Sequence, residues 1–252
     1  MGVNKTNPET RYCPQKRTMK EANYNRTHRV LSLIVIVAAL YGSIRTIWTD
    51  GTANFTNLLY FTVLSNLAIA GIHLYFLYAE RRALRDPSFQ IPQAMRTLKY
   101  VLTISITLTF SVFFVLLLPE YGLPVLWMPG NLSTHLIAPI AAILDYIFFE
   151  KSHVKHCYTL LYTLIPPYAY VVLTLILSRL GVRYAEGSIV PYYFLDYEKL
   201  GWLRISGNGI GVIYWILLIS VVMLGIGQLI LVLNNLVQKR KTKVYDLLRK
   251  SG

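Results

Sequence analysis

Residues 205–238 read ISGNGIGVIYWILLISVVMLGIGQLILVLNNLVQ and contain no charged side chain. A helix needs about 20 predominantly apolar residues to cross the hydrocarbon core of a bilayer, so this stretch predicts a membrane-spanning helix. Other uncharged stretches occur at 30–44, 51–79, 100–119, 121–144 and 156–178. In the whole chain 54% of the residues are hydrophobic, and the mean hydropathy of +0.45 is high for a soluble domain.

These stretches predict an all-α integral membrane protein, a six-helix bundle with helices at roughly 30–48, 55–78, 99–118, 132–149, 157–179 and 209–237. The spans form one predicted domain, 30–237, between a basic tail at 1–29 and a second basic tail at 238–252. No internal repeat is evident, and 1–29 lacks the apolar region and small-residue cleavage site that a signal peptide requires.

Basic residues are distributed unevenly along the chain. Twenty of the 25 Lys and Arg residues lie in the two tails and in the segments 79–99 and 150–156. Cytoplasmic loops of membrane proteins carry an excess of such residues. Both termini are therefore predicted to face the cytoplasm, and 119–131 and 180–207 to face outside, in a multi-pass protein of the plasma membrane.

The net charge of +13 has two interpretations. Nucleic-acid binding is one, but the cations lie beside the predicted helix ends. Contact with anionic lipid headgroups on the cytoplasmic side is the simpler account, so nucleic acid is not expected as a partner. Cys13 and Cys157 also fall on the cytoplasmic side, where a structural disulfide is not expected. His153 and His156 lie near Cys157, but this cluster is small, and neither a metal nor a cofactor is expected.

Two external segments are longer than a simple connection needs. Segment 119–131 contains three prolines and Trp127, and 180–207 is rich in tyrosine. Aromatic side chains settle at membrane interfaces, so these segments can form a belt at the headgroup level. Long loops also serve as lids, and a lid over an outward-facing cavity is the alternative. Within 157–179, Pro166 and Pro167 predict an interruption of the helix.

Thr62 and His135 are polar residues inside long apolar stretches, where a polar side chain has to face a bundle interior or a cavity. With the predicted topology, Thr62 lies ~10 Å and His135 ~6 Å below the outer end of its helix, at 1.5 Å per residue. Ser65 and Asn66 follow Thr62 by three and four positions and share its helix face.

Other polar residues extend this pattern toward the cytoplasmic side. Thr103, Thr107 and Ser111 recur every four residues, and Asp145 follows His135 by ten. Together with Ser65 and Asn66 they are candidate substrate-binding residues. Structural roles compete for each of them: Thr and Ser hydroxyls bond carbonyls of their own helix, Asp145 can anchor a Lys or Arg, and His73 can bridge two helices.

The chemistry of Thr62 and His135 suggests a catalytic pair. A threonine hydroxyl becomes a nucleophile when a base accepts its proton, and an imidazole can be that base near neutral pH. An ester among acyl chains could reach both groups without leaving the bilayer. The oxyanion would require a donor, for which Ser65 and Asn66 are candidates.

Three short motifs carry a resemblance to a known family. They are YFTVLSNL at 60–67, NLSTH at 131–135 followed by Pro139 and Asp145, and VPYYFLD at 190–196. They resemble the androgen-induced protein family and its prokaryotic six-helix relatives over roughly 30–237. Animal members are intramembrane threonine hydrolases that cleave fatty acid esters of hydroxy fatty acids, which implies Thr62 as nucleophile and His135 as its partner. Unlike that branch, this chain has no acidic residue near Thr62, and its His-to-Pro spacing is one residue shorter.

The sequence therefore predicts an intramembrane hydrolase of a lipid-like ester, with Thr62 as nucleophile and His135 as base. A non-enzymatic protein that binds or transports a lipid or small molecule in the same polar cavity is the alternative. A structural membrane protein with polar helix bridges is a third interpretation.

The topology can be tested with single cysteines in a variant that lacks Cys13 and Cys157. A membrane-impermeant maleimide is expected to label Val125→Cys in intact cells and Tyr245→Cys only after permeabilisation, because the basic tails should stay inside. Labelling of position 245 from outside intact cells would refute the predicted orientation.

Overall fold

The computed structural model describes residues 19–49, 51–150, 158–207 and 209–250. Within them, six helical stretches are long and apolar enough to span a membrane, which confirms the predicted all-α six-helix bundle and a multi-pass membrane protein. The spans are Arg26–Ile47, Phe61–Arg85, Gln93–Tyr121, Pro129–Phe149, Tyr158–Arg179 and Val212–Lys243.

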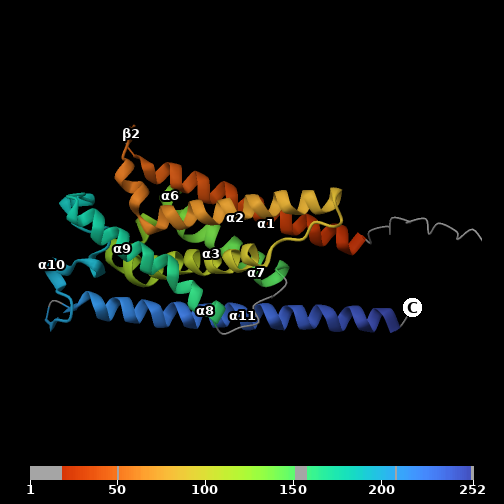
Figure 1. The fold of residues 1–252 in the computed structure, drawn as a ribbon. Coiled ribbons are helices and arrows are strands. Elements are labelled where there is room, and N and C mark those ends of the chain that lie inside the picture. Colours follow the sequence, from red (N-terminus) through yellow and green to blue (C-terminus); the bar gives the residue numbers. More distant parts are fainter. Residues whose placement is uncertain (1–18, 50, 151–157, 208, 251–252) are drawn as a thin grey trace, which may run out of the picture.

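Long helices form the frame of the bundle (Figure 1): α1 (Met19–Ile47), α2 (Phe61–Arg85), α3 (Gln93–Val112), α7 (Ala138–Phe149), α9 (Ile165–Arg179) and α11 (Val212–Lys250). Shorter turns extend three of them. A π-helical turn η2 (Phe113–Leu117) and α4 (Leu118–Tyr121) follow α3, α6 (Pro129–Leu132) and a π-helical turn η3 (Ser133–Ile137) precede α7, and α8 (Tyr158–Leu161) and the 3₁₀ turn η4 (Tyr162–Leu164) precede α9.

The remaining elements lie in the connections: β1 (Trp48–Thr49), β2 (Thr52–Ala53), η1 (Phe55–Leu59), α5 (Leu123–Leu126), η5 (Ala185–Gly187), η6 (Tyr193–Leu195), α10 (Tyr197–Leu200), β3 (Ile205–Ser206) and β4 (Gly209–Ile210). Each strand pair is an antiparallel hairpin, with Trp48 opposite Ala53 and Ile205 opposite Ile210. The first and last described residues lie at one end of the bundle, and these hairpins lie at the other.

Helix bounds differ from the prediction at both ends of the chain. The first helix begins at Met19 instead of residue 30, and the last ends at Lys250 instead of 237. The hydropathy of a sequence indicates where its apolar stretch ends. Lys, Arg and Leu have high helix propensity, so the helix itself can continue into water. The limits 30 and 237 therefore mark where the apolar sequence ends rather than where the helices end.

The predicted interruption at Pro166 and Pro167 is present as a change of helix type. The chain passes through the 3₁₀ turn η4, and α9 begins at Ile165, so both prolines fall in its first turn. Proline lacks an N–H group, and the first-turn N–H groups of a helix have no partner within the helix. Both prolines therefore lie where the missing N–H group destabilises the helix least.

Apolar side chains pack between the helices and also cover the outside. Ile69, Ile106 and Ala138 belong to one buried cluster between α2, α3 and the start of α7. Val37 and Val221 point outward with more than half of their surface exposed. Such exposed apolar surface suits contact with lipid rather than water.

An ion pair lies between α3 and α7 at the end of the bundle that holds the termini. Lys99 Nζ lies 2.8 Å from Asp145 Oδ2, and both side chains have 0% exposure. His28 of α1 joins the pair, because its Nε2 is 3.2 Å from Asp145 Oδ1 and its Nδ1 is 2.7 Å from Glu80 of α2. Asp145 is therefore a structural anchor that links three helices, and Glu80 adds the fourth.

Glu150 and Asn234 extend this polar cluster to α11. Glu150 contacts Lys99 Nζ at 3.1 Å and Arg96 at 2.7 Å. The amide nitrogen of Asn234 on α11 lies 2.8–3.1 Å from the carbonyl oxygens of Tyr146, Ile147 and Glu150. The last carbonyls of a helix lack partners within it, so the two N–H groups of this amide bond to the end of α7 and fix α11 to it.

Replacing one member of the buried pair is expected to destabilise the bundle strongly. Lys99→Met should lower the free energy of unfolding by about 3–5 kcal/mol, because it leaves Asp145 and Glu150 as buried charges without their shared cation. Unfolding of the purified protein in detergent, followed by circular dichroism, measures this.

Lys199→Met is the matched control. Lys199 is 80% exposed and lies 3.5 Å from Asp196, so its loss should cost at most about 1 kcal/mol. Equal losses in Lys99→Met and Lys199→Met would contradict a structural role for the buried pair.

Candidate functional site

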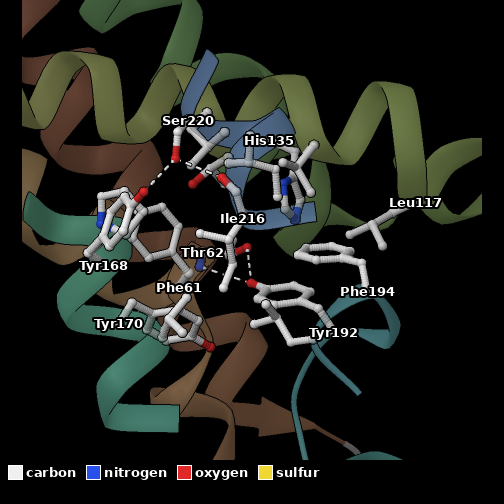
Figure 2. A pocket seen from close by; sticks show the side chains of 17 residues that line it. Phe61, Thr62, Leu117, His135, Tyr168, Tyr170, Tyr192, Phe194, Ile216 and Ser220 are labelled. Carbon is white, nitrogen blue, oxygen red and sulfur yellow. Dashed lines mark hydrogen bonds between the residues drawn. The ribbon is translucent and has the colours of Figure 1, made fainter. Parts of the chain in front are cut away.

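A pocket opens at the end of the bundle opposite the termini and encloses about 670 Å³, its mouth included. Its walls come from α2, α3, η3, α9, α11 and the external segment 180–207, and are mostly apolar and aromatic. No Asp, Glu, Lys or Arg is among the described residues that line it. Its polar side chains carry hydroxyls and one imidazole (Figure 2): Thr62, Thr109, His135, Tyr168, Tyr170, Tyr192 and Ser220.

Thr62 lies in the first turn of α2, because the chain forms the 3₁₀ turn η1 before it and α2 begins only at Phe61. The predicted depth of ~10 Å was counted from Phe55 at the rise of an α-helix. Because α2 begins only at Phe61, this depth along α2 was wrong. The Thr62 N–H donates to the Tyr192 hydroxyl at 3.4 Å, and Thr62 Oγ1 lies 3.3 Å from the same oxygen. The side chain is 9% exposed and faces the pocket.

Ser65 and Asn66 share the face of Thr62, as predicted, but they do not line the pocket. Both donate to the Thr62 main-chain carbonyl, at 3.1 and 2.8 Å. Asn66 also donates to the Thr134 carbonyl, and Ser65 contacts Thr109 Oγ1 at 2.9 Å. These contacts fix Thr62 relative to two other spans, and the proposed use of Ser65 or Asn66 as oxyanion donors is not supported.

His135 lies in the π-helical turn η3 and is 6% exposed. Its ring stacks on Phe113 of the other π-helical turn, η2, with centroids 4.0 Å apart and planes 15° apart. It also lies beside the Thr109 main-chain carbonyl, while its Nδ1 has no hydrogen-bond partner among the described residues. Single π-helical turns are frequent at functional sites, and here a pair of them orients one imidazole.

Thr62 and His135 thus share one pocket but do not form a pair in this state. A hydrogen bond between them is not among those of the described residues, because the Thr62 hydroxyl contacts Tyr192. A group placed in the pocket can reach both side chains.

The other candidate substrate-binding residues lie away from the pocket. Thr103, Thr107 and Ser111 each donate to the carbonyl four residues earlier on α3, at 2.7–2.9 Å. This bonding satisfies a hydroxyl inside an apolar bundle. Asp145 belongs to the ion pair at the far end, and His73 Nδ1 contacts Ser32 at 3.2 Å, which makes it a helix bridge.

Five polar residues of the pocket were missing from the sequence-based candidates: Thr109, Tyr168, Tyr170, Tyr192 and Ser220. Tyr192 is the contact of Thr62, and Tyr168 and Ser220 contact each other at 3.1 Å between α9 and α11. Tyr192 comes from 180–207, for which a belt and a lid were both open. Tyr192 and its neighbours Phe194 and Leu195 form part of the pocket wall, as a lid would.

Tyr192 is protonated under physiological conditions. Burial raises the pKa of its phenol to about 12, since burial disfavours the charged form. Neutral Tyr192 therefore retains an O–H group that can donate a hydrogen bond.

Groups of three or more His, Cys, Asp or Glu residues arranged to hold a metal are not found in the part of the chain that the structure describes. His153, His156, Cys157 and Cys13 lie outside the described residues.

Comparisons with known proteins identify no relative: no family model, curated protein or solved structure matches this chain. The resemblance to the androgen-induced protein family therefore stays a sequence-based expectation. Any activity has to be argued from the geometry of the pocket.

Proposed function

We propose that this protein is an intramembrane hydrolase that cleaves a lipid-like ester, with Thr62 as nucleophile and His135 as general base. The observation that carries the proposal is the buried His135, whose unpartnered Nδ1 belongs to a side chain on the same pocket as the Thr62 hydroxyl. A buried nitrogen without a partner costs free energy, and its place on a side chain that lines the pocket, unlike that of His73, supports a role in the site.

The reaction divides into two acyl transfers. Thr62 Oγ1 bonds to the acyl carbon while its proton passes to His135, which gives that proton to the alcohol oxygen as the ester C–O bond breaks. Water then attacks the acyl-threonine carbon. His135 takes a proton from the water, and Thr62 regains a proton as the fatty acid leaves.

The pocket favours a substrate with long apolar chains and little charge near the ester. Its walls hold aromatic and aliphatic side chains, and no Lys or Arg that would pair with a phosphate is among the described residues that line it. Helices α9 and α11 form one side and carry exposed apolar residues such as Val172 and Val221. A fatty acid ester, including one of a hydroxy fatty acid, could enter sideways from the outer leaflet of the plasma membrane.

A lipid- or small-molecule-binding or transport protein is the second candidate. The contact of the Thr62 hydroxyl with Tyr192 instead of His135 favours it, because an engaged hydroxyl is less ready to react. The same pocket would then hold an apolar ligand without chemistry. In both cases anionic headgroups on the cytoplasmic side are the proposed contact of the basic tails.

Thr62→Ala is expected to abolish ester cleavage and to leave the fold intact. Each ~1.4 kcal/mol added to the activation free energy slows the reaction tenfold, so loss of covalent catalysis should have a large effect on the rate. Interhelical hydrogen bonds in membranes contribute on average only about 0.6 kcal/mol to stability, so the fold should tolerate the change. Thr62→Ser keeps the hydroxyl and should retain activity. The assay measures fatty acid release from branched fatty acid esters and short aryl esters by detergent-solubilised protein.

The matched control is Thr163→Ala. Thr163 is a buried threonine that donates to the Leu160 carbonyl and lies outside the pocket, so its loss should leave turnover unchanged. Unchanged turnover in Thr62→Ala would eliminate the threonine mechanism. Absence of turnover in the wild type, together with tight binding of a fatty acid, would favour the binding protein.

His135→Ala is expected to be as inactive as Thr62→Ala, and the double variant to be little worse than either, because residues that act as a unit are not additive. His73→Ala is the control, since His73 is also a buried histidine with one unpartnered ring nitrogen but lies away from the pocket. Steady-state rates of the four proteins measure this. Equal activity losses in His73→Ala and His135→Ala would point to stability instead of base catalysis.

A further inference from the structure

The start of α2 is capped by a side chain that is distant in sequence. Its N-cap residue, Tyr60, makes no side-chain capping bond, and the first N–H groups of a helix lack partners within it. The Tyr192 oxygen accepts from the N–H of Thr62 at 3.4 Å. Just before α2, Tyr170 donates to the carbonyl of Leu59, the last residue of η1, at 2.9 Å.

These bonds determine the direction of the hydrogen bond between Tyr192 and Thr62. A phenol oxygen has two lone pairs and one proton. The N–H group of Thr62 takes up one lone pair. The phenol proton needs an acceptor of its own, and Thr62 Oγ1, 3.3 Å away, is the acceptor that the hydrogen bonds of the described residues offer it.

The proton of Thr62 must therefore point elsewhere. Ser65 and Asn66 occupy the Thr62 carbonyl below, and neither contacts its hydroxyl. The pocket remains as the open direction, and it is lined by His135, whose Nδ1 has no hydrogen-bond partner among the described residues. The raised pKa of Tyr192 supports this arrangement, because a neutral phenol keeps its proton.

We propose that Tyr192 is a positioning residue for ester cleavage: its O–H donates to Thr62 Oγ1 and so directs the threonine proton into the pocket, toward His135. This inference rests on the proposed hydrolase function. During attack the Thr62 proton passes to His135, and Tyr192 keeps its own proton and stabilises the negative charge that builds up on Oγ1.

The position of Tyr192 depends on the external segment. Its ring stacks on Phe194, with centroids 5.3 Å apart and planes 7° apart, and meets Tyr60 edge-on at 5.9 Å. Phe194 in turn packs against Trp215 of α11. The orientation of Thr62 by Tyr192 therefore depends on how this segment packs against Tyr60 and α11.

Tyr192→Phe tests the role of the hydroxyl, with labelling of Thr62 by a long-chain alkyl fluorophosphonate as readout. Labelling should slow by at least about tenfold, since loss of one orienting hydrogen bond acts on reaction geometry. Affinity for a dansyl-labelled fatty acid should stay within about twofold, because the ring remains in the pocket.

Tyr184→Phe is the matched control. Tyr184 is a buried phenol of the same external segment, also packs edge-on against Tyr60, and does not line the pocket. Its labelling rate should equal that of the wild type.

The outcomes separate this inference from the proposed function. A wild type that fluorophosphonate does not label overturns both. If the wild type and Tyr192→Phe are labelled at the same rate, only the positioning role is overturned. The same holds if Tyr192→Phe loses fatty acid binding along with labelling. If Tyr192→Phe does not fold, Tyr192→Gln and Tyr192→Leu replace it. The glutamine amide can accept and donate hydrogen bonds, so Tyr192→Gln should be labelled faster than Tyr192→Leu. Equal labelling rates of these two variants overturn the positioning role.

Discussion

The buried pair of Lys99 and Asp145 is the constraint on which the rest of the structure depends. In hydrocarbon neither charge can be left alone, so α3 and α7 are held at one fixed relative position. His28 extends this constraint to α1 and, through Glu80, to α2. The spans that carry Thr62 and His135 are therefore held together at the end far from both residues.

The two ends of the bundle use polar residues in opposite ways. At the ionic end, charges neutralise one another, and Asn234 donates to carbonyls at the end of α7. At the other end hydroxyls and an imidazole surround an apolar space, and His135 keeps a nitrogen without a partner among the described residues. Rigidity at one end allows the other to keep polar groups in a fixed arrangement without bonding all of them.

The spans could be predicted from the sequence because the bilayer sets their length, and Thr62 and His135 because each interrupts an apolar stretch. The same signal also selected Thr107, whose hydroxyl bonds to a carbonyl of its own helix. A threonine that lines a pocket and one that bonds to its own helix cannot be distinguished in a sequence. Tyr192 was not found because its segment is typical of an interfacial belt. Its contact with Thr62 spans 130 residues, and no helical periodicity connects residues so far apart.

The two π-helical turns have a consequence for how this protein tolerates change in length. Each contains one residue more than an α-helical turn would, which rotates the remainder of its span by about 100° at 3.6 residues per turn. The turn at 133–137 thus lets the His135 and Asp145 ends of one span face different directions. Deletion of Ile137, which does not line the pocket, would keep the polar side chains of the pocket and every charge of the ionic cluster, yet the two ends of the span would no longer both face the bundle.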